Sequence, residues 1–178
     1  METHLLKLLR KRRSIRQFAP KQIETDQLDA IIEAAVRSPT SRGRNPWEFI
    51  VVTDPLLLKR LASAKAHGSA FLAGAPLAIV VTADTTKSDV WTEDCSIAAM
   101  VIQLAAEDLG LGSCWAQIRL RPHSAACSAN AYLQELLDLP ATHEVECIIG
   151  IGYPDESKAG HATGSLPFNQ VHRDRFGR

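Results

Sequence analysis

A nearly unbroken apolar run at residues 77–83 (LAIVVTA) is the feature that most constrains the fold of this chain. The run lies between Pro76 and Asp84, and its β-branched residues favour a strand. A strand with almost no polar residues has to be covered on both faces, as in the interior of a sheet. The sequence therefore predicts a central strand between two layers of other elements.

Strand and helix patterns alternate around this central strand. Aromatic and β-branched residues predict further strands at residues 47–53, 113–118 and 145–153. Apolar residues at helical spacing predict helices at residues 4–11, from 25 to about 38, and at 55–62, 90–109 and 129–137. No internal repeat or low-complexity linker is found, so we expect one domain over residues 1–178. This alternation by itself suggests a doubly wound parallel sheet.

The longest periodic segment runs from about residue 90 to 109. We expect it to be the core helix, with Ala98 and Ala99 as small contacts, because its larger apolar residues share one face: Ile97, Met100, Val101, Leu104 and Ala105. Helix starts are also visible in the sequence. Thr25 is the expected N-cap of one helix, and Asp54 followed by Pro55 should open another.

Balanced charge and scattered cysteines limit the classes of function. Lys plus Arg and Asp plus Glu number 20 each, so no net field attracts the chain to nucleic acid or a membrane surface. The basic residues within 7–16 would suit nucleic acid only with interleaved aromatics, and only Phe18 is near. No apolar stretch approaches the ~20 residues of a membrane span, and no metal-ligand spacing appears. The four cysteines form no CxxC pair, which predicts reduced thiols in a cytoplasmic protein.

The densest cluster of functional groups is Arg12-Arg13-Ser14-Ile15-Arg16, at the expected end of the first helix. Three guanidinium groups and a hydroxyl can bind a phosphate dianion through charge-assisted hydrogen bonds. A basic run at a helix C-terminus also complements the helix dipole. The cluster alone leaves both interpretations open.

Two loops and two histidines are weaker candidates. Residues 38–47 (SPTSRGRNPW) offer hydroxyls, amides and guanidinium groups to a polar ligand. Residues 109–115 (LGLGSCW) join a helix to a strand but do not form the GxGxxG turn of a dinucleotide-binding fold. His67 and His123 could act as acid–base groups, although neither has a catalytic spacing. An ordinary loop, a helix cap and structural histidines remain the alternatives.

Several segments, taken in order, resemble the nitroreductase family, and in particular its short members: RRSIRQF, SPTSRGRNPWEFIVV, HGSAFLAGAPLAIVV, GLGSCW, IIGIGYP and VHRDRF. The resemblance extends from about residue 5 to 176. It implies an α+β sandwich with a central mixed, mostly antiparallel sheet flanked by helices, a homodimer, and FMN at the subunit interface. This architecture conflicts with the parallel sheet suggested by the alternation, and we adopt it as our expectation. Residues 154–178 are then expected to form a C-terminal arm that packs on the dimer.

The resemblance also assigns cofactor-binding residues. The family positions that bind the FMN phosphate and ribityl chain correspond to Arg12, Arg13 and Ser14. Arg16 corresponds to the basic residue near the pyrimidine edge of the flavin. The loop that packs on the flavin from the opposite subunit corresponds to Pro39, Thr40, Ser41 and Arg42. In this loop Gly43 and Asn45 replace the Asn and Gln of many members.

The family strand whose backbone lies beside the flavin N5 corresponds to a segment that includes Trp115, Ala116, Gln117 and Ile118. The amides of Gln117 and Ile118 are the expected donors to N5. Gly152 and Lys158 would close the phosphate side, and His67 and Trp91 would shape the substrate face.

The activity implied by the resemblance is reduction of small electron-poor acceptors, such as nitroaromatics or quinones, with hydride from NADH or NADPH. No catalytic side chain is required because FMN performs the redox chemistry. With no separate nicotinamide domain, donor and acceptor would alternate at one flavin face in a ping-pong reaction. The alternatives are a dehalogenase-type or dehydrogenase-type relative, and a flavin-binding store or sensor without turnover.

Overall fold

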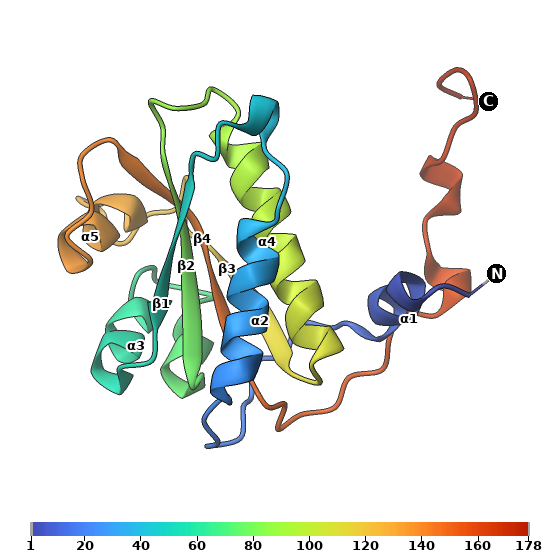
Figure 1. The fold of residues 1–178 in the computed structure, drawn as a ribbon, viewed down its shortest axis with the longest axis horizontal. Coiled ribbons are helices and arrows are strands. Elements are labelled where there is room, and N and C mark those ends of the chain that lie inside the picture. The colour runs from blue at the N-terminus through green and yellow to red at the C-terminus, as the bar shows by residue number, and fades with distance from the viewer. Residues whose placement is uncertain (1, 178) are drawn as a thin grey trace.

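A four-stranded antiparallel sheet forms the centre of the protein (Figure 1), as seen in a computed structural model that describes residues 2–177. The strand order is β1 (Trp47–Val52), β2 (Leu77–Asp84), β4 (His143–Gly152) and β3 (Gly112–Gln117). All three neighbouring pairs are antiparallel. The expected α+β fold is therefore confirmed, and the doubly wound parallel alternative is wrong.

The order of the strands explains why alternation was misleading. Both β2 and β3 pair antiparallel with β4, so they run parallel to each other, joined by α4 (Trp91–Asp108) as in a parallel crossover. β4 comes later in the chain and inserts between them. Two helical segments, α3 (Pro55–Ala62) and the 3₁₀ turn η2 (Ala70–Gly74), join β1 to its antiparallel neighbour β2.

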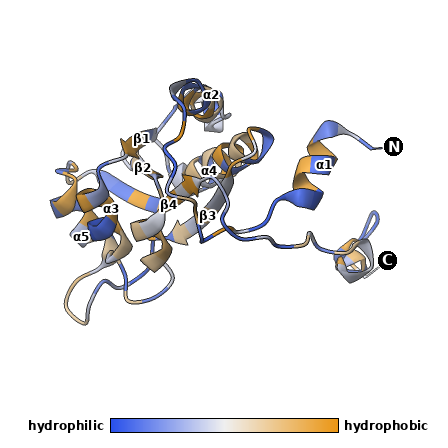
Figure 2. Cartoon of the chain, turned by 90° about the horizontal axis from the view of Figure 1, so that it is seen from below, coloured by the Kyte–Doolittle hydropathy of each residue, from blue (hydrophilic) through white to orange (hydrophobic). Residues whose placement is uncertain are grey.

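The apolar run identified in the sequence is an interior strand, as predicted. Residues 77–83 are all buried, with Ile79 and Val81 in one core cluster and Ala78 and Val80 in the other. Helices α2 (Thr25–Val36) and α4 cover the first face of the sheet. Helices α3 and α5 (Ala129–Leu136) cover the second, and Figures 1 and 2 show the resulting layers.

Two helix starts follow local capping chemistry. Asp54 caps α3 through a hydrogen bond from the Leu56 amide to its side chain (2.9 Å), with Pro55 in the first helical position, as predicted. The N-cap of α2 is Glu24 rather than Thr25. Gln27 completes a capping box there, because its side chain accepts from the Glu24 amide. The prediction for Thr25 was therefore wrong by one residue.

Helix α4 presents a different face to the core from the one predicted. Its buried side combines Ile102 with the small residues Cys95, Ala98, Ala99 and Ala106. The larger apolar residues chosen from the sequence are only partly covered, and Ile97 is 43% exposed. Small side chains allow the helix to approach the sheet closely, which leaves a stripe on the outer side: Ile97, Met100, Val101 and Leu104.

The C-terminal residues form an arm that extends away from the body beside α1 (His4–Lys11), as Figures 1 and 2 show. The arm contains two short 3₁₀ turns, η3 (Thr163–Ser165) and η4 (Phe168–Gln170). Several of its apolar side chains are exposed: Leu166, Phe168, Val171 and Phe176. Such a segment has apolar surface that this chain alone does not cover.

Three further observations concern the described residues only. None of their helices combines the length and hydropathy that crossing a bilayer requires. No group of three or more His, Cys, Asp or Glu side chains in residues 2–177 could hold a metal ion. The four cysteines are free thiols.

Candidate functional site

The basic segment lies against the first residues of β3. Helix α1 ends at Lys11, and the chain continues with a parallel bridge between Ser14 and Ser113, in which the Ile15 amide donates to Ser113 across 3.0 Å. Gly112 makes this approach possible, because a Cβ there would lie 2.8 Å from the Cβ of Ile15. The second glycine of the GLG sequence is thus required by close packing.

Residues 154–161 cross over the basic segment and close one side of it. The Lys158 ammonium donates to the Ser14 carbonyl (2.8 Å) and pairs with Glu156 (2.9 Å). Glu156 also accepts from the backbone amides of Arg16 and Gln17. The hydrogen bond from Lys158, followed by that from the Arg16 amide, lowers the pKa of Glu156. Arg13 donates to the Ala159 carbonyl.

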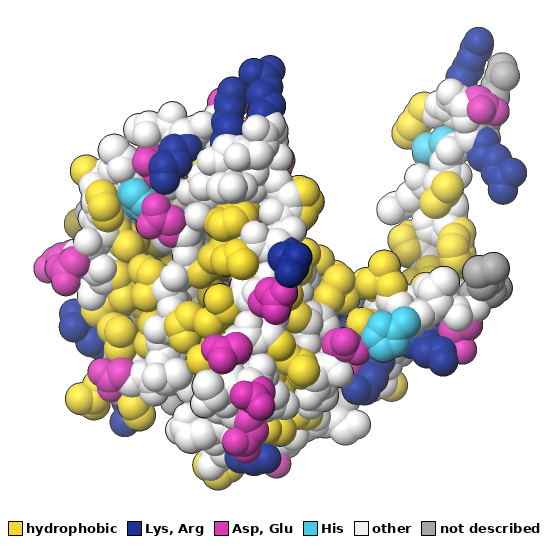
Figure 3. Space-filling model, in the orientation of Figure 1, with side chains coloured by type: hydrophobic (Ala, Val, Ile, Leu, Met, Phe, Trp, Pro, Cys, Tyr) yellow, Lys and Arg dark blue, Asp and Glu magenta, His cyan; other side chains and the backbone are white. Residues whose placement is uncertain are grey.

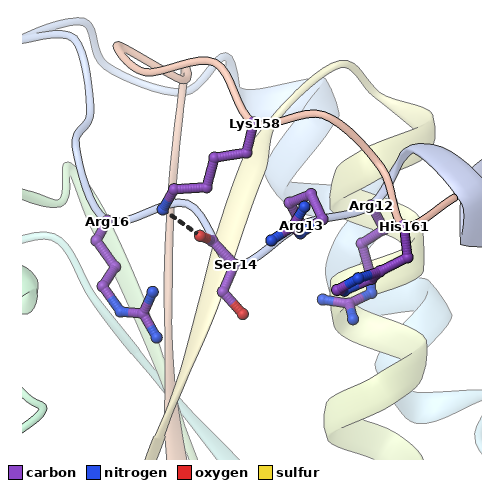
Figure 4. Close-up of a pocket in the computed structure, with 6 residues that line it drawn as sticks. All are labelled: Arg12, Arg13, Ser14, Arg16, Lys158 and His161. Carbon is purple, nitrogen blue, oxygen red and sulfur yellow. Dashed lines mark hydrogen bonds between the residues drawn. The ribbon is translucent and has the colours of Figure 1, made fainter. Parts of the chain in front are cut away.

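These contacts enclose a basic pocket of about 310 Å³ (Figure 4), which we call the phosphate pocket. Its lining residues are Arg12, Arg13, Ser14, Arg16, Lys158 and His161. Within residues 2–177, Lys158 is the only one of these side chains paired with a carboxylate. Several positive charges that lack carboxylate partners make the pocket suitable for a phosphate dianion. Lys158 lies where the resemblance placed it, whereas His161 was not identified from the sequence.

The open edge of β3 continues from this pocket. β3 is an edge strand of the sheet, and Ser14 pairs with its outer side at Ser113. Past Ser113, no strand of the described sheet pairs with this side. The Ile118 amide donates to the Glu146 carbonyl (3.1 Å), so it is not available to a ligand. Successive amides of a strand point in opposite directions, which directs the Gln117 amide to the open edge. Of the two expected donors, Gln117 has the suitable geometry.

Side chains at the end of β3 form a polar chain. The Trp115 indole donates to the Gln117 carboxamide oxygen (2.9 Å), and the Gln117 nitrogen donates to the Glu146 carboxyl (3.2 Å). Arg119 lies over the ring of Trp91, 5.6 Å from its centroid. Trp91 is therefore close to this end of the strand, as its proposed role requires. Ala116 is buried in the core, and the same alternation directs its amide to β4 rather than to the open edge.

The loop at residues 39–42 lies far from the phosphate pocket of the same chain. The Ser41 amide donates to buried Asp94 (2.9 Å) in the first turn of α4, and the Asn45 amide donates to the Thr40 hydroxyl (3.1 Å). The last turn of α4 lies beside the pocket, because Glu107 pairs with Lys11 (3.2 Å). Thirteen residues of helix separate Asp94 from Glu107, or about 20 Å. The loop and the phosphate pocket therefore lie at opposite ends of α4.

Gly152, His123 and His67 were also considered as site residues, and the structure shows the surroundings of each. A Cβ at Gly152 would lie 2.6 Å from Pro76 and 2.9 Å from Phe18, so packing explains this glycine. His123 stacks on Tyr132 with ring centroids 4.1 Å apart and contacts the Ser63 carbonyl, which supports its structural interpretation. His67 is exposed in the loop between α3 and η2.

Lys65 and Glu146 were missed by the sequence analysis. Lys65 shares the loop of His67, and burial, with the field of Arg121, lowers its pKa. Glu146 is buried in β4. A single acidic residue inside an otherwise apolar strand was the signal that could have identified Glu146.

Comparison with known proteins decides the family. A model described as the nitroreductase family matches residues 9–68 and 58–153, which is most of the chain. The chain belongs to the nitroreductase family. Among nitroreductase-family relatives, a protein of Archaeoglobus fulgidus provisionally named an NADH dehydrogenase/NAD(P)H nitroreductase is 36% identical over 176 residues, covering 96% of this chain and 98% of the relative.

Solved structures agree with this assignment. An FMN-dependent nitroreductase from Clostridium difficile R20291 superposes with a TM-score of 0.94 at 47% identity, covering 95% of this chain and 98% of that one. A Parabacteroides distasonis protein, provisionally named an NADH dehydrogenase/NAD(P)H nitroreductase, has a TM-score of 0.89 at 31% identity and covers 98% and 100%. The nitroreductase-family fold therefore extends over nearly the whole chain.

Proposed function

We propose that this nitroreductase-family protein is an FMN-dependent NAD(P)H oxidoreductase that reduces small electron-poor organic acceptors. The observation that carries the proposal is the phosphate pocket, whose arginines lack carboxylate partners within residues 2–177 and whose Ser14 forms a bridge with Ser113 on edge strand β3. The similarity to a protein named FMN-dependent nitroreductase supports the same cofactor. When bound, FMN supplies hydride transfer between the nicotinamide donor and the acceptor.

The residues of the phosphate pocket and of β3 can be assigned to the phosphate, the pyrimidine ring and the N5 atom of FMN. Arg12, Arg13 and Lys158 would hold the phosphate through charge-assisted hydrogen bonds, with the Ser14 hydroxyl as a further partner. Arg16 is exposed and uncommitted to a carboxylate within the described chain, so it can reach the pyrimidine side of the ring. There its positive charge would favour electron uptake, because fixed charge stabilises the negative charge that develops. The Gln117 amide at the open edge would face N5.

We further propose a homodimer, in which the loop beside the first turn of α4 packs on the flavin of the opposite subunit, as the family resemblance implies. A partner subunit would supply Pro39, Thr40, Ser41 and Arg42 to the flavin. The apolar stripe of α4 provides one contact surface. A second is a groove of about 290 Å³ between α2 and edge strand β1, lined by Ile32, Ala35, Val36, Phe49, Val51 and Ile79. Figure 3 shows apolar side chains over α2 and β1 and others on the C-terminal arm, which suits an arm exchanged between subunits.

The substrates would meet at the flavin face that remains open. Residues 2–177 form one sheet with its covering helices, so we propose that NADH or NADPH and the acceptor use this face in turn. Trp91, near the end of β3, and exposed His67 are the residues proposed to shape it. The free thiols support a cytoplasmic location for this reaction.

Steady-state kinetics test the reaction type. The FMN-loaded protein is assayed with NADH or NADPH against a quinone and a nitroaromatic at several fixed concentrations. The proposal predicts parallel double-reciprocal lines, as for a ping-pong reaction. Turnover restricted to a halogenated or an azoline substrate would instead indicate a specialised relative, and donor consumption no faster than the leak to oxygen would indicate a flavin store or sensor.

A further inference from the structure

Glu146 interrupts the most buried stretch of β4. Val81 of β2 faces Cys147, whereas Thr82 faces Val145, so Glu146 is an extra residue without a partner in β2. This β-bulge leaves the Glu146 side chain only 4% exposed. Burying a carboxyl group is costly unless it is fully hydrogen-bonded. Bulges of this kind often redirect a side chain beside a functional site.

Only one of the two carboxyl oxygens of Glu146 has a hydrogen-bond partner among the described residues. Its Oε1 accepts from the Gln117 carboxamide (3.2 Å), and Gln117 in turn accepts from the Trp115 indole. Its Oε2 is buried and has no hydrogen-bond partner among the described residues. A chain of hydrogen bonds thus runs from the strand proposed to face the flavin to a carboxyl oxygen with spare capacity.

The surroundings of Glu146 favour its neutral form. Burial raises the pKa of Glu146, and the field of Glu93 acts in the same direction, while the hydrogen bond from Gln117 and the field of Arg119 oppose both. The other titratable neighbours are thiols. Burial, with a smaller effect of Glu146, raises the pKa of Cys95 to about 12 and raises that of Cys147 as well. These thiols therefore remain protonated near neutral pH.

We propose that Glu146 is a positioning residue that, through Gln117, couples proton uptake to the redox state of a flavin held along the open edge of β3. The inference rests on the proposed function. Reduction places negative charge beside the strand, and a nearby like charge disfavours the carboxylate. Glu146 then takes a proton from solvent while NADH or NADPH provides the hydride. It releases this proton to solvent when the acceptor has taken the hydride. The acceptor takes its own proton from solvent, so the overall reaction consumes one donor, one acceptor and one proton.

The test is the pH dependence of the flavin midpoint potential in the FMN-loaded protein, between about pH 5 and 8. Wild type is compared with Glu146→Gln, which keeps the shape of the side chain but cannot ionise. Glu144→Gln is the matched control, because Glu144 is exposed on the same strand two residues away. Glu146→Met serves as a second neutral variant if Glu146→Gln folds poorly.

We expect the flavin midpoint potential to change more steeply with pH in wild type and in Glu144→Gln than in the Glu146 variants. One additional proton taken up on reduction would make the slope up to about twice that of Glu146→Gln. Equal slopes in wild type and Glu146→Gln, with FMN bound to both, would overturn this inference and leave the proposed function intact. Failure of the wild-type protein to bind FMN would overturn both.

Discussion

The Nζ atom of Lys158 lies 2.8 Å from the carbonyl oxygen of Ser14, a hydrogen bond between residues 144 positions apart. This contact joins the start of the C-terminal arm to the basic segment. Because Lys158 also pairs with Glu156, and Glu156 accepts from the Arg16 amide, the arm fixes the backbone on one side of the phosphate pocket. Cofactor retention and the position of the arm should therefore be linked.

Replacing Arg12 should weaken FMN binding. Arg12→Ala removes a charge-assisted phosphate partner, at a cost on the order of 1.5–3 kcal/mol, or about 10-fold to 100-fold in dissociation constant. Fluorescence titration of the apoprotein with FMN measures this change. Arg10→Ala is the control, because Arg10 pairs with Glu2 on the exposed side of α1 and does not line the pocket. Equal affinities for the wild type and Arg12→Ala would remove Arg12 from the phosphate site.

Asp94 should hold the loop that we assign to the partner's flavin. It is 3% exposed and accepts from the half-buried Ser41 amide and the buried Ser88 hydroxyl, so Asp94→Ala leaves both donors without their acceptor. We expect the free energy of unfolding to fall by about 1–3 kcal/mol, together with weaker FMN retention. Urea unfolding and FMN titration measure the two effects. Asp89→Ala is the control: it removes only a surface pair with Arg44 and should change little, whereas equal losses in both variants would contradict the role of Asp94.

The outer stripe of α4 should be required for dimerisation. Met100→Glu places a charge in this stripe, where a partner helix would otherwise bury apolar surface. Sedimentation velocity should show a shift from dimer to monomer and a loss of bound FMN. Leu56→Glu provides the control on α3, because Leu56 is 70% exposed and away from the stripe. A wild-type monomer that retains FMN would contradict the two-chain site.

Glu146 should make the stability of the apoprotein depend on pH. Its folded-state pKa is raised from the ordinary value of 4.5, so the folded state binds the proton more tightly than the unfolded state. The resulting stabilisation is complete below pH 4.5 and is lost as pH rises through the folded-state pKa. Urea unfolding over this range should show wild type losing stability relative to Glu146→Gln as pH increases. A constant difference between the two proteins would show that Glu146 does not titrate in this way.

Local patterns predicted the elements well because each depends on its own residues. The fully apolar β2 and the Asp54-Pro55 start of α3 are examples. The direction of the sheet was not predictable locally, because it depends on β4 inserting between β2 and β3. The outer face of α4 was also misjudged. Ala98 and Ala99 are buried as the small contacts that we expected, whereas Ile97, predicted on the core face, is 43% exposed.

In the candidate site, residues that form a local sequence pattern were predicted, whereas residues placed by long-range contacts were not. The basic segment was visible as a charge cluster, and family resemblance identified Lys158 in a tail that has little pattern of its own. His161 could not be found, because its place in the pocket depends on the path of the arm. The length of α4 was predicted, but the contact that holds Ser41 at its first turn, far from the phosphate pocket, is encoded by no motif.

Anaerobic reduction of the bound flavin tests the central claim most directly. The purified protein, incubated with FMN and freed of excess cofactor, should show the visible absorption band of oxidised flavin. Addition of NADH or NADPH without oxygen should bleach this band, and a quinone added afterwards should restore it. A protein that retains no flavin after incubation, or a bound flavin that neither nicotinamide bleaches, would contradict the assignment as an FMN-dependent NAD(P)H oxidoreductase.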